Sequence, residues 1–213
     1  MKNYLTEFIG TFFLVLTIGL ANGSGSILAP LAIGSVLMVM TYMGSYISGA
    51  HYNPAITLAA YIRGKIEVKE AGIYWLLQII GAIAGGFLAG MLVQDDAFVF
   101  AMAPANSASV VEVLLTELLF TFALVLVFLN VSLSEKTRGN SYFGLAIGFA
   151  YLAGLFAGGP VSGGVFNPAV GLGPNLAVQN FTPIWIYIVA PLAGGALAGF
   201  VSKLQNPEEK VSE

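Results

Sequence analysis

Charge is scarce in this sequence. Only 9% of its 213 residues are Asp, Glu, Lys or Arg, against about 25% in an average soluble domain. So few charges do not cover a surface that faces water, which excludes a soluble globular chain. The basic residues form no dense cluster, so we expect no binding to nucleic acid.

Cysteine is absent and histidine occurs once. The chain therefore forms no disulfide bond and no thiolate metal site, and its cysteine content says nothing about the redox compartment. A single histidine leaves little scope for a metal cluster, and we find no catalytic constellation. We predict a protein that is not an enzyme and that has no metal and no cofactor.

Apolar length, in contrast, is abundant. Hydrophobic residues make up 57% of the chain, and its mean hydropathy is +0.85. A bilayer core about 30 Å thick takes about 20 apolar residues per helix, so the chain has room for six spans and for no soluble domain. The sequence predicts one all-α membrane domain over 1–213, with spans near 4–22, 30–48, 70–93, 109–132, 141–159 and 183–204.

The first of these spans has the layout of a secretory signal peptide, because Lys2 precedes an apolar run. Glu7 interrupts that run early, and many apolar segments follow it. We therefore interpret this segment as the first membrane span.

Two apolar stretches, near 53–63 and 167–178, open at Asn-Pro and are too short to cross a bilayer. About ten residues at 1.5 Å per residue reach about 15 Å, half of the hydrocarbon thickness. The sequence therefore predicts two re-entrant half-helices in addition to the six spans.

The halves of the chain, about 1–105 and 106–213, repeat one another. Three predicted spans per half make the second copy inverted, so the two half-helices should meet end to end at mid-membrane. The matching landmarks are Thr6-Glu7 with Thr116-Glu117, Ser48-Gly49 with Ser162-Gly163, and the glycine-rich segments 84–90 and 193–199.

The basic residues all fall on one side of this map, which fixes an orientation through the positive-inside rule. The opposite loops carry only Asp95 and Asp96. Both termini are predicted to be cytoplasmic, in a plasma membrane, or in the inner membrane of a Gram-negative organism. The basic residues are Lys2, Arg63, Lys65, Lys69, Lys136, Arg138, Lys203 and Lys210.

Each Asn-Pro pair is typical of a helix N-terminus. Proline suits the first helical position because its missing N–H would have no partner there, and an asparagine just before it caps the helix. Two such ends at mid-membrane aim two positive dipoles at one point and repel cations. The asparagine amides donate hydrogen bonds to a solute in the lumen. The two motifs are Asn53-Pro54-Ala55 and Asn167-Pro168-Ala169.

The segments around these motifs, 48–57 and 163–174, resemble the two signatures of the aquaporin (major intrinsic protein) family, and the resemblance covers essentially the whole chain. It implies six tilted helices and two half-helices per protomer, with four protomers side by side as a homotetramer in the bilayer. It also implies that Glu7 and Glu117 brace the half-helix loops by accepting backbone hydrogen bonds. The alternative for these carboxylates is an interfacial position near a helix start.

His51 matches a family position near the cytoplasmic half of the pore. A static hydrogen bond that holds the loop is the role we expect for it, in preference to a proton shuttle or gate.

The family pattern also marks where this chain departs from it. Most members follow the second Asn-Pro-Ala with an arginine at the narrowest constriction, where this chain has Val170. By the same pattern the other constriction residues are Ile33, Leu155 and Gly164, so the predicted filter has no charged group and no side-chain hydrogen-bond donor. Glycerol-conducting members carry an aspartate where this chain has Gly171.

These features predict a passive channel for water or small uncharged solutes that excludes ions through its half-helix dipoles. Two consequences of the apolar filter compete, because losing the arginine widens the opening while branched side chains narrow and dewet it. The alternatives are a channel for ammonia, urea, glycerol, peroxide or metalloid acids with low water permeability, a structural membrane protein with a closed pore, and an ion channel.

Overall fold

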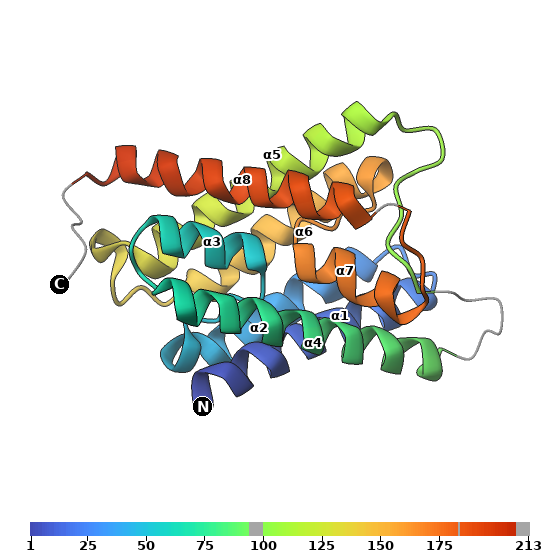
Figure 1. The fold of residues 1–213 in the computed structure, drawn as a ribbon, viewed down its shortest axis with the longest axis horizontal. Helices are drawn as coiled ribbons and strands as arrows, with labels where there is room; N and C mark the ends of the chain where they lie inside the picture. The colour runs from blue at the N-terminus through green and yellow to red at the C-terminus, as the bar shows by residue number, and fades with distance from the viewer. Residues whose placement is uncertain (94–99, 183, 208–213) are drawn as a thin grey trace.

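Six long apolar helices run side by side through the protein (Figure 1). The computed structural model describes residues 1–93, 100–182 and 184–207. Each of the six is long and apolar enough to cross a membrane, which confirms the predicted all-α fold with six spans. They are α1 (Lys2–Gly23), α2 (Ala29–Ser48), α4 (Val68–Leu92), α5 (Val110–Phe128), α6 (Phe143–Ser162) and α8 (Ile184–Gln205).

The fourth span is longer than α5 alone. A π-helical turn, η1 (Leu129–Leu133), continues it, and a short 3₁₀ turn, η2 (Glu135–Thr137), follows. The span therefore runs over Val110–Leu133, one residue beyond the predicted end near 132.

Two short helices, α3 (Pro54–Ile62) and α7 (Pro168–Ala177), contain 9 and 10 residues. At 1.5 Å per residue each is about 14–15 Å long, half of a bilayer core. Each follows a long helix that ends at a glycine in the left-handed conformation, Gly49 at φ 85° and Gly163 at φ 90°. A left-handed residue at this place stops the helix and turns the chain, which lets a second helix begin within a few residues.

The half-helices pack across the two halves of the chain. Within the halves, α1 contacts α2 and α4, and α5 contacts α6 and α8, while α2 and α6 join the halves. The first half-helix, α3, packs on α8, and the second, α7, packs on α4. Figure 1 accordingly shows α3 and α7 between α8 and α4.

Glycine permits this close packing at two equivalent places. A Cβ added to Gly195 on α8 would lie 2.6 Å from the carbonyl oxygen of Ala55, and one added to Gly86 on α4 would lie 3.0 Å from Cα of Pro174. Each half-helix therefore rests on a helix of the opposite half at backbone distance, as small residues allow between membrane helices.

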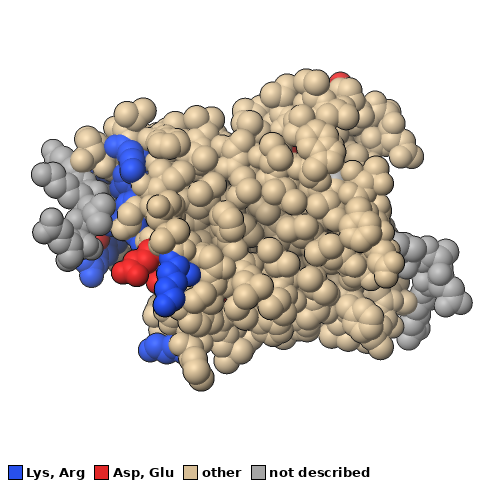
Figure 2. All heavy atoms as spheres, in the orientation of Figure 1, with Lys and Arg blue, Asp and Glu red and all other residues tan. Residues whose placement is uncertain are grey.

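The visible Lys and Arg side chains gather at one end of the molecule, where α1 begins and α8 ends (Figures 1 and 2). The sides of the six-helix body are almost free of charge in this view. Three residues of the charge prediction, Asp95, Asp96 and Lys210, lie outside the described residues.

The packing of α8 on α3 leads to a stability prediction. Gly195→Ala should destabilise the protein by about 1–3 kcal/mol because the new methyl group overpacks against the Ala55 carbonyl. Thermal unfolding in detergent micelles measures the change. Gly90→Ala is the matched control, because a Cβ at Gly90 meets nothing within 4 Å; equal melting temperatures for the two variants would contradict the packing argument.

Candidate functional site

Asparagine side chains cap both half-helices. Asn53 Oδ1 accepts a hydrogen bond from the Ala55 N–H at 2.8 Å, and Asn167 Oδ1 accepts one from the Ala169 N–H at 2.9 Å. Both asparagines have an extended backbone, and proline follows each at the first helical position. The two motifs thus form two capped helix N-termini.

The same asparagines link the two half-helix loops to each other. Asn53 Nδ2 donates to the Phe166 carbonyl at 3.0 Å, and Asn167 Nδ2 donates to the Tyr52 carbonyl at 2.9 Å. The bonds are reciprocal, so the N-termini of α3 and α7 are held close together. An amide carries two N–H groups, which leaves each asparagine a second donor.

Three residues of these loops, Ala50, Tyr52 and Phe166, adopt a left-handed backbone conformation that is uncommon outside glycine. Tyr52 has φ 50° and Phe166 has φ 49°, and such a left-handed residue costs about 1–3 kcal/mol. In both cases the N–H donates to a buried carboxylate, of Glu7 or of Glu117, and the carbonyl accepts from the opposite asparagine. Hydrogen bonds on both sides of the residue hold it in place.

The Glu7 carboxylate lies fully buried on α1 and binds the first loop. Oε1 accepts from Ser48 Oγ at 2.6 Å and from the His51 N–H at 3.0 Å. Oε2 accepts from the Tyr52 N–H at 2.7 Å and from Gln78 Nε2 at 2.8 Å. Charge-assisted bonds of this kind offset the cost of burying the carboxylate.

Glu117 on α5 binds the second loop in the same way. Oε1 accepts from Ser162 Oγ at 2.7 Å and from the Val165 N–H at 3.0 Å, and Oε2 accepts from the Phe166 N–H at 2.6 Å. Its side chain is fully buried, and its carboxylate accepts from two N–H groups of the second loop.

His51 is buried beside the first turn of α3. Its Nδ1 lies 3.1 Å from Thr57 Oγ1, and its ring lies edge-on to Tyr74 and Phe128 at centroid distances of 5.3 and 5.5 Å. The ring therefore joins the loop to α3 and to the helices around it.

A cavity of about 200 Å³, which we call the outer cavity, lies at the end of the molecule away from the basic residues. Of the predicted constriction, Ile33, Leu155 and Gly164 line it together. Val170 is fully buried in α7 and lies outside this lining. The other lining residues are Ile18, Asn22, Pro30, Met102, Tyr151, Gly159 and Gly163.

Sequence reasoning missed the most important of these, Tyr151, although a pattern for it was available. Tyr151 precedes Leu155 by four residues on α6, and residues four apart share one face of a helix. The same spacing on α2 places Leu37 next to Ile33. Met102, in contrast, lies outside the helices, where no helical periodicity predicts its position.

Comparison with known proteins identifies the family. Residues 1–202 match the family described as Major intrinsic protein. The chain belongs to the major intrinsic protein family. Among its relatives are a probable aquaporin of NIP type from Nicotiana alata, 31% identical over 99% of this chain and 80% of the relative, and the aquaporin TIP2-3 of Zea mays, 34% identical over 94% and 86%.

The fold also matches a solved structure. An aquaglyceroporin from Plasmodium falciparum superposes with a TM-score of 0.81, at 24% identity and over 97% of both chains. Membership of the major intrinsic protein family makes this protein a multi-pass membrane channel for water or small uncharged solutes, and not an enzyme.

This major intrinsic protein has no room for a side chain at position 171, where glycerol-conducting members carry an aspartate. A Cβ added to Gly171 would lie 2.4 Å from Cβ of Tyr187 on α8. Tyr187 is fully buried, and its hydroxyl donates to the Ser162 carbonyl at 2.6 Å. Since α8 packs directly against α7 here, an aspartate would require α8 to move.

A larger cavity, of about 720 Å³, which we call the inner cavity, opens at the basic end of the channel. Its lining includes the charged side chains of Lys65, Glu135 and Arg138, whereas no charged side chain lines the outer cavity. Arg138 forms an exposed ion pair with Glu135 at 3.2 Å, and pairs of this kind contribute little to stability. The lining residues are Ser45, Tyr46, Lys65, Val131, Ser132, Leu133, Ser134, Glu135, Arg138, Gly139, Asn140 and Phe143.

Metal binding has no visible basis in the part of the chain that the structure describes. Within residues 1–93, 100–182 and 184–207, no group of three or more His, Cys, Asp or Glu side chains is placed to hold a metal ion.

The bonds of Glu117 lead to a second stability prediction. Glu117→Gln turns one acceptor atom into a donor that faces buried N–H groups, and each orphaned donor costs about 1–3 kcal/mol. Thermal unfolding in micelles should show a large loss of stability. Glu112→Gln is the control, because Glu112 is exposed in a capping box at the start of α5 and glutamine also serves there. Equal losses for both variants would contradict the bracing role.

Proposed function

We propose that this protein conducts small uncharged solutes passively along a path from the outer cavity, past the two Asn-Pro-Ala motifs, to the inner cavity. The reciprocal hydrogen bonds of Asn53 and Asn167 carry this proposal, because they join two half-helix N-termini inside a bundle of membrane helices. The second N–H of each amide then replaces a hydrogen bond that a solute loses on leaving water.

The exclusion of ions follows from the same geometry. The N-termini of α3 and α7 both present positive dipole ends toward the path. None of the side chains that line the outer cavity is charged, so none of them replaces the hydration shell of an ion. We therefore assign the barrier to the dipoles and to the cost of dehydration, without the filter arginine that Val170 replaces.

The outer constriction of the proposed path is apolar. Ile33 and Leu155 face it from α2 and α6, and Gly164 forms part of the loop before α7. Branched apolar side chains hold water weakly, so we propose that weakly hydrated solutes such as ammonia pass this constriction more readily, relative to water, than they pass a filter with arginine. The crowding of Gly171 by Tyr187 favours a path that differs from that of the glycerol-conducting members.

Proteoliposomes test this function. Stopped-flow light scattering should show permeability to water or to at least one of ammonia, urea, glycerol and peroxide, and planar bilayers should show no ionic conductance. Leu155→Ala should raise solute permeability by about twofold or more by opening the constriction. Leu145→Ala, on an exposed part of the same helix, should leave permeability unchanged.

Three outcomes would contradict the proposal. Permeability to none of these solutes would indicate a closed-pore structural protein. Ionic conductance would indicate an ion channel. Equal effects of Leu155→Ala and Leu145→Ala would place the path elsewhere.

We further propose that residues 1–213 form one domain of two inverted halves, about 1–105 and 106–213, and that four copies assemble as a homotetramer. The gathering of Lys and Arg at the end where α1 begins supports cytoplasmic termini in a plasma membrane (Figure 2).

The absence of native cysteine makes the orientation testable with single introduced thiols. In right-side-out cells, Ser107→Cys should react with a membrane-impermeant maleimide, whereas Lys65→Cys should react only after the cells are opened. Both positions are exposed. The reverse labelling pattern would overturn the proposed orientation.

A further inference from the structure

The outer and inner cavities are separated by a stretch of the proposed path that neither of them includes. On α2 the outer cavity is lined by Ile33 and the inner one by Ser45 and Tyr46; on α6 the outer one is lined by Leu155 and the inner one by Phe143. The two cavities have no lining residue in common. On α2, residue 37 lies between these positions. On α6, Tyr151 lies one turn from Leu155 toward Phe143 and is the last residue of that helix to line the outer cavity, so the floor of the outer cavity is formed at the level of residues 37 and 151.

Four buried side chains, one from each of α1, α2, α5 and α6, form what we term the central ring. Two pairs are related by the sequence repeat. The spacing from Leu37 to Tyr151 equals that from Ser48 to Ser162, and the spacing from Leu14 to Leu124 equals that from Glu7 to Glu117. The ring is Leu14, Leu37, Leu124 and Tyr151, with exposed fractions of 1%, 5%, 2% and 1%.

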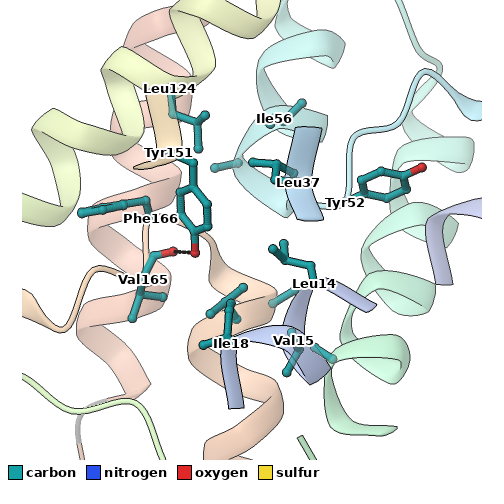
Figure 3. Packing of buried hydrophobic residues seen from close by; sticks show 14 of the residues in the cluster. Leu14, Val15, Ile18, Leu37, Tyr52, Ile56, Leu124, Tyr151, Val165 and Phe166 are labelled. Carbon is teal, nitrogen blue, oxygen red and sulfur yellow. Dashed lines mark hydrogen bonds between the residues drawn. The ribbon is translucent and has the colours of Figure 1, made fainter. Parts of the chain in front are cut away.

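Tyr151 is the ring member that breaks this symmetry. Figure 3 shows the phenol group of Tyr151 at the centre of the packed side chains, between Leu124 and Ile18. Leu37 lies across from it, and its hydroxyl is directed at Val165. A phenol group reaches farther from its helix than the leucine that the repeat would place there. The proposed path is therefore narrower at this level than it would be if all four members of the central ring were leucines.

Two contacts hold the phenol in this position. The hydroxyl donates to the Val165 carbonyl at 3.1 Å, and the ring meets Phe166 edge-on at a centroid distance of 6.1 Å. Both partners belong to the loop before α7 that Glu117 braces. Tyr151 is thus a fixed element of the wall.

We propose that Tyr151 is the size-selecting residue of this channel, at mid-membrane, and that it restricts the path to solutes about as small as water and ammonia. This inference rests on the proposed function. The hydroxyl hydrogen is committed to Val165, so the oxygen offers only lone pairs, while Asn53 and Asn167 supply donors. A permitted solute must be compact and must both donate and accept hydrogen bonds; glycerol and urea are too large.

Paired substitutions separate size from polarity. Tyr151→Leu restores a ring of four leucines and should raise glycerol and urea permeability about fivefold or more, by removing the steric block. Tyr151→Phe keeps the aromatic side chain but removes its hydroxyl oxygen. Glycerol permeability should therefore stay at its low level, while water permeability should fall about threefold. Stopped-flow measurements on proteoliposomes, normalised to protein content, supply both values.

Matched controls lie on the exposed outside of the same bundle. Phe149→Leu makes the same kind of change as Tyr151→Leu at an exposed position of α6, and Tyr42→Phe removes a hydroxyl that donates to the Ser141 carbonyl outside both cavities. Both controls should conduct like the unmodified protein. Leu37→Ala opens the ring from the opposite side and should also admit glycerol, which tests the ring if Tyr151→Leu does not fold.

The outcomes distinguish this inference from the proposed function. If the unmodified protein conducts water or ammonia and the folded Tyr151→Leu and Leu37→Ala variants gain no glycerol permeability, Tyr151 does not select by size and the inference is overturned. Substantial glycerol permeability of the unmodified protein overturns it too. If every variant is impermeable to every solute, the proposed function itself fails. If Tyr151→Leu conducts and the unmodified protein conducts no solute, the phenol closes the path instead of selecting solutes by size, and the inference is overturned.

Discussion

Backbone polar groups inside a bilayer have no water to bond, and each group left without a partner costs several kcal/mol. This chain places two irregular loops inside its bundle of membrane helices, so the N–H and C=O groups of those loops need partners from within the protein. Glu7 and Glu117 bind the loop N–H groups, and Asn53 and Asn167 bind the carbonyls. The half-helices, and the channel that they form, depend on these hydrogen bonds.

The same bonds place the chemistry of the channel. Because each asparagine both caps its own half-helix and holds the opposite loop, the two helix ends cannot separate without breaking both functions. The positive dipole ends of the two half-helices are therefore fixed close together. Close packing at Gly86 and Gly195 then sets each half-helix directly on a helix of the other half, so the loops, the caps and the bundle pack as one unit.

Several features could be read from the sequence because they depend on composition and local geometry. Apolar length predicts the six spans, with ends within a few residues of the structure. Proline at the first helical position and asparagine before it predict where α3 and α7 begin. Counting along the family pattern brought Ile33, Leu155 and Gly164 to one cavity. Val170, the fourth residue that the family pattern predicts for the constriction, does not line this cavity. It is fully buried, and its burial depends on how α7 packs.

The sequence by itself determined a membrane channel with two capped half-helices, because the length of apolar runs and the chemistry of Asn-Pro are local properties. Tertiary structure alone decided which side chains face the path. A membrane helix is apolar on every face, so periodicity does not separate a residue that lines the channel from one that meets lipid. The four-residue spacing from Leu155 places Tyr151 on the same face of α6. Its contacts with Val165 and Phe166, in contrast, follow from the packing of α6 on the second loop, which no spacing in the sequence encodes.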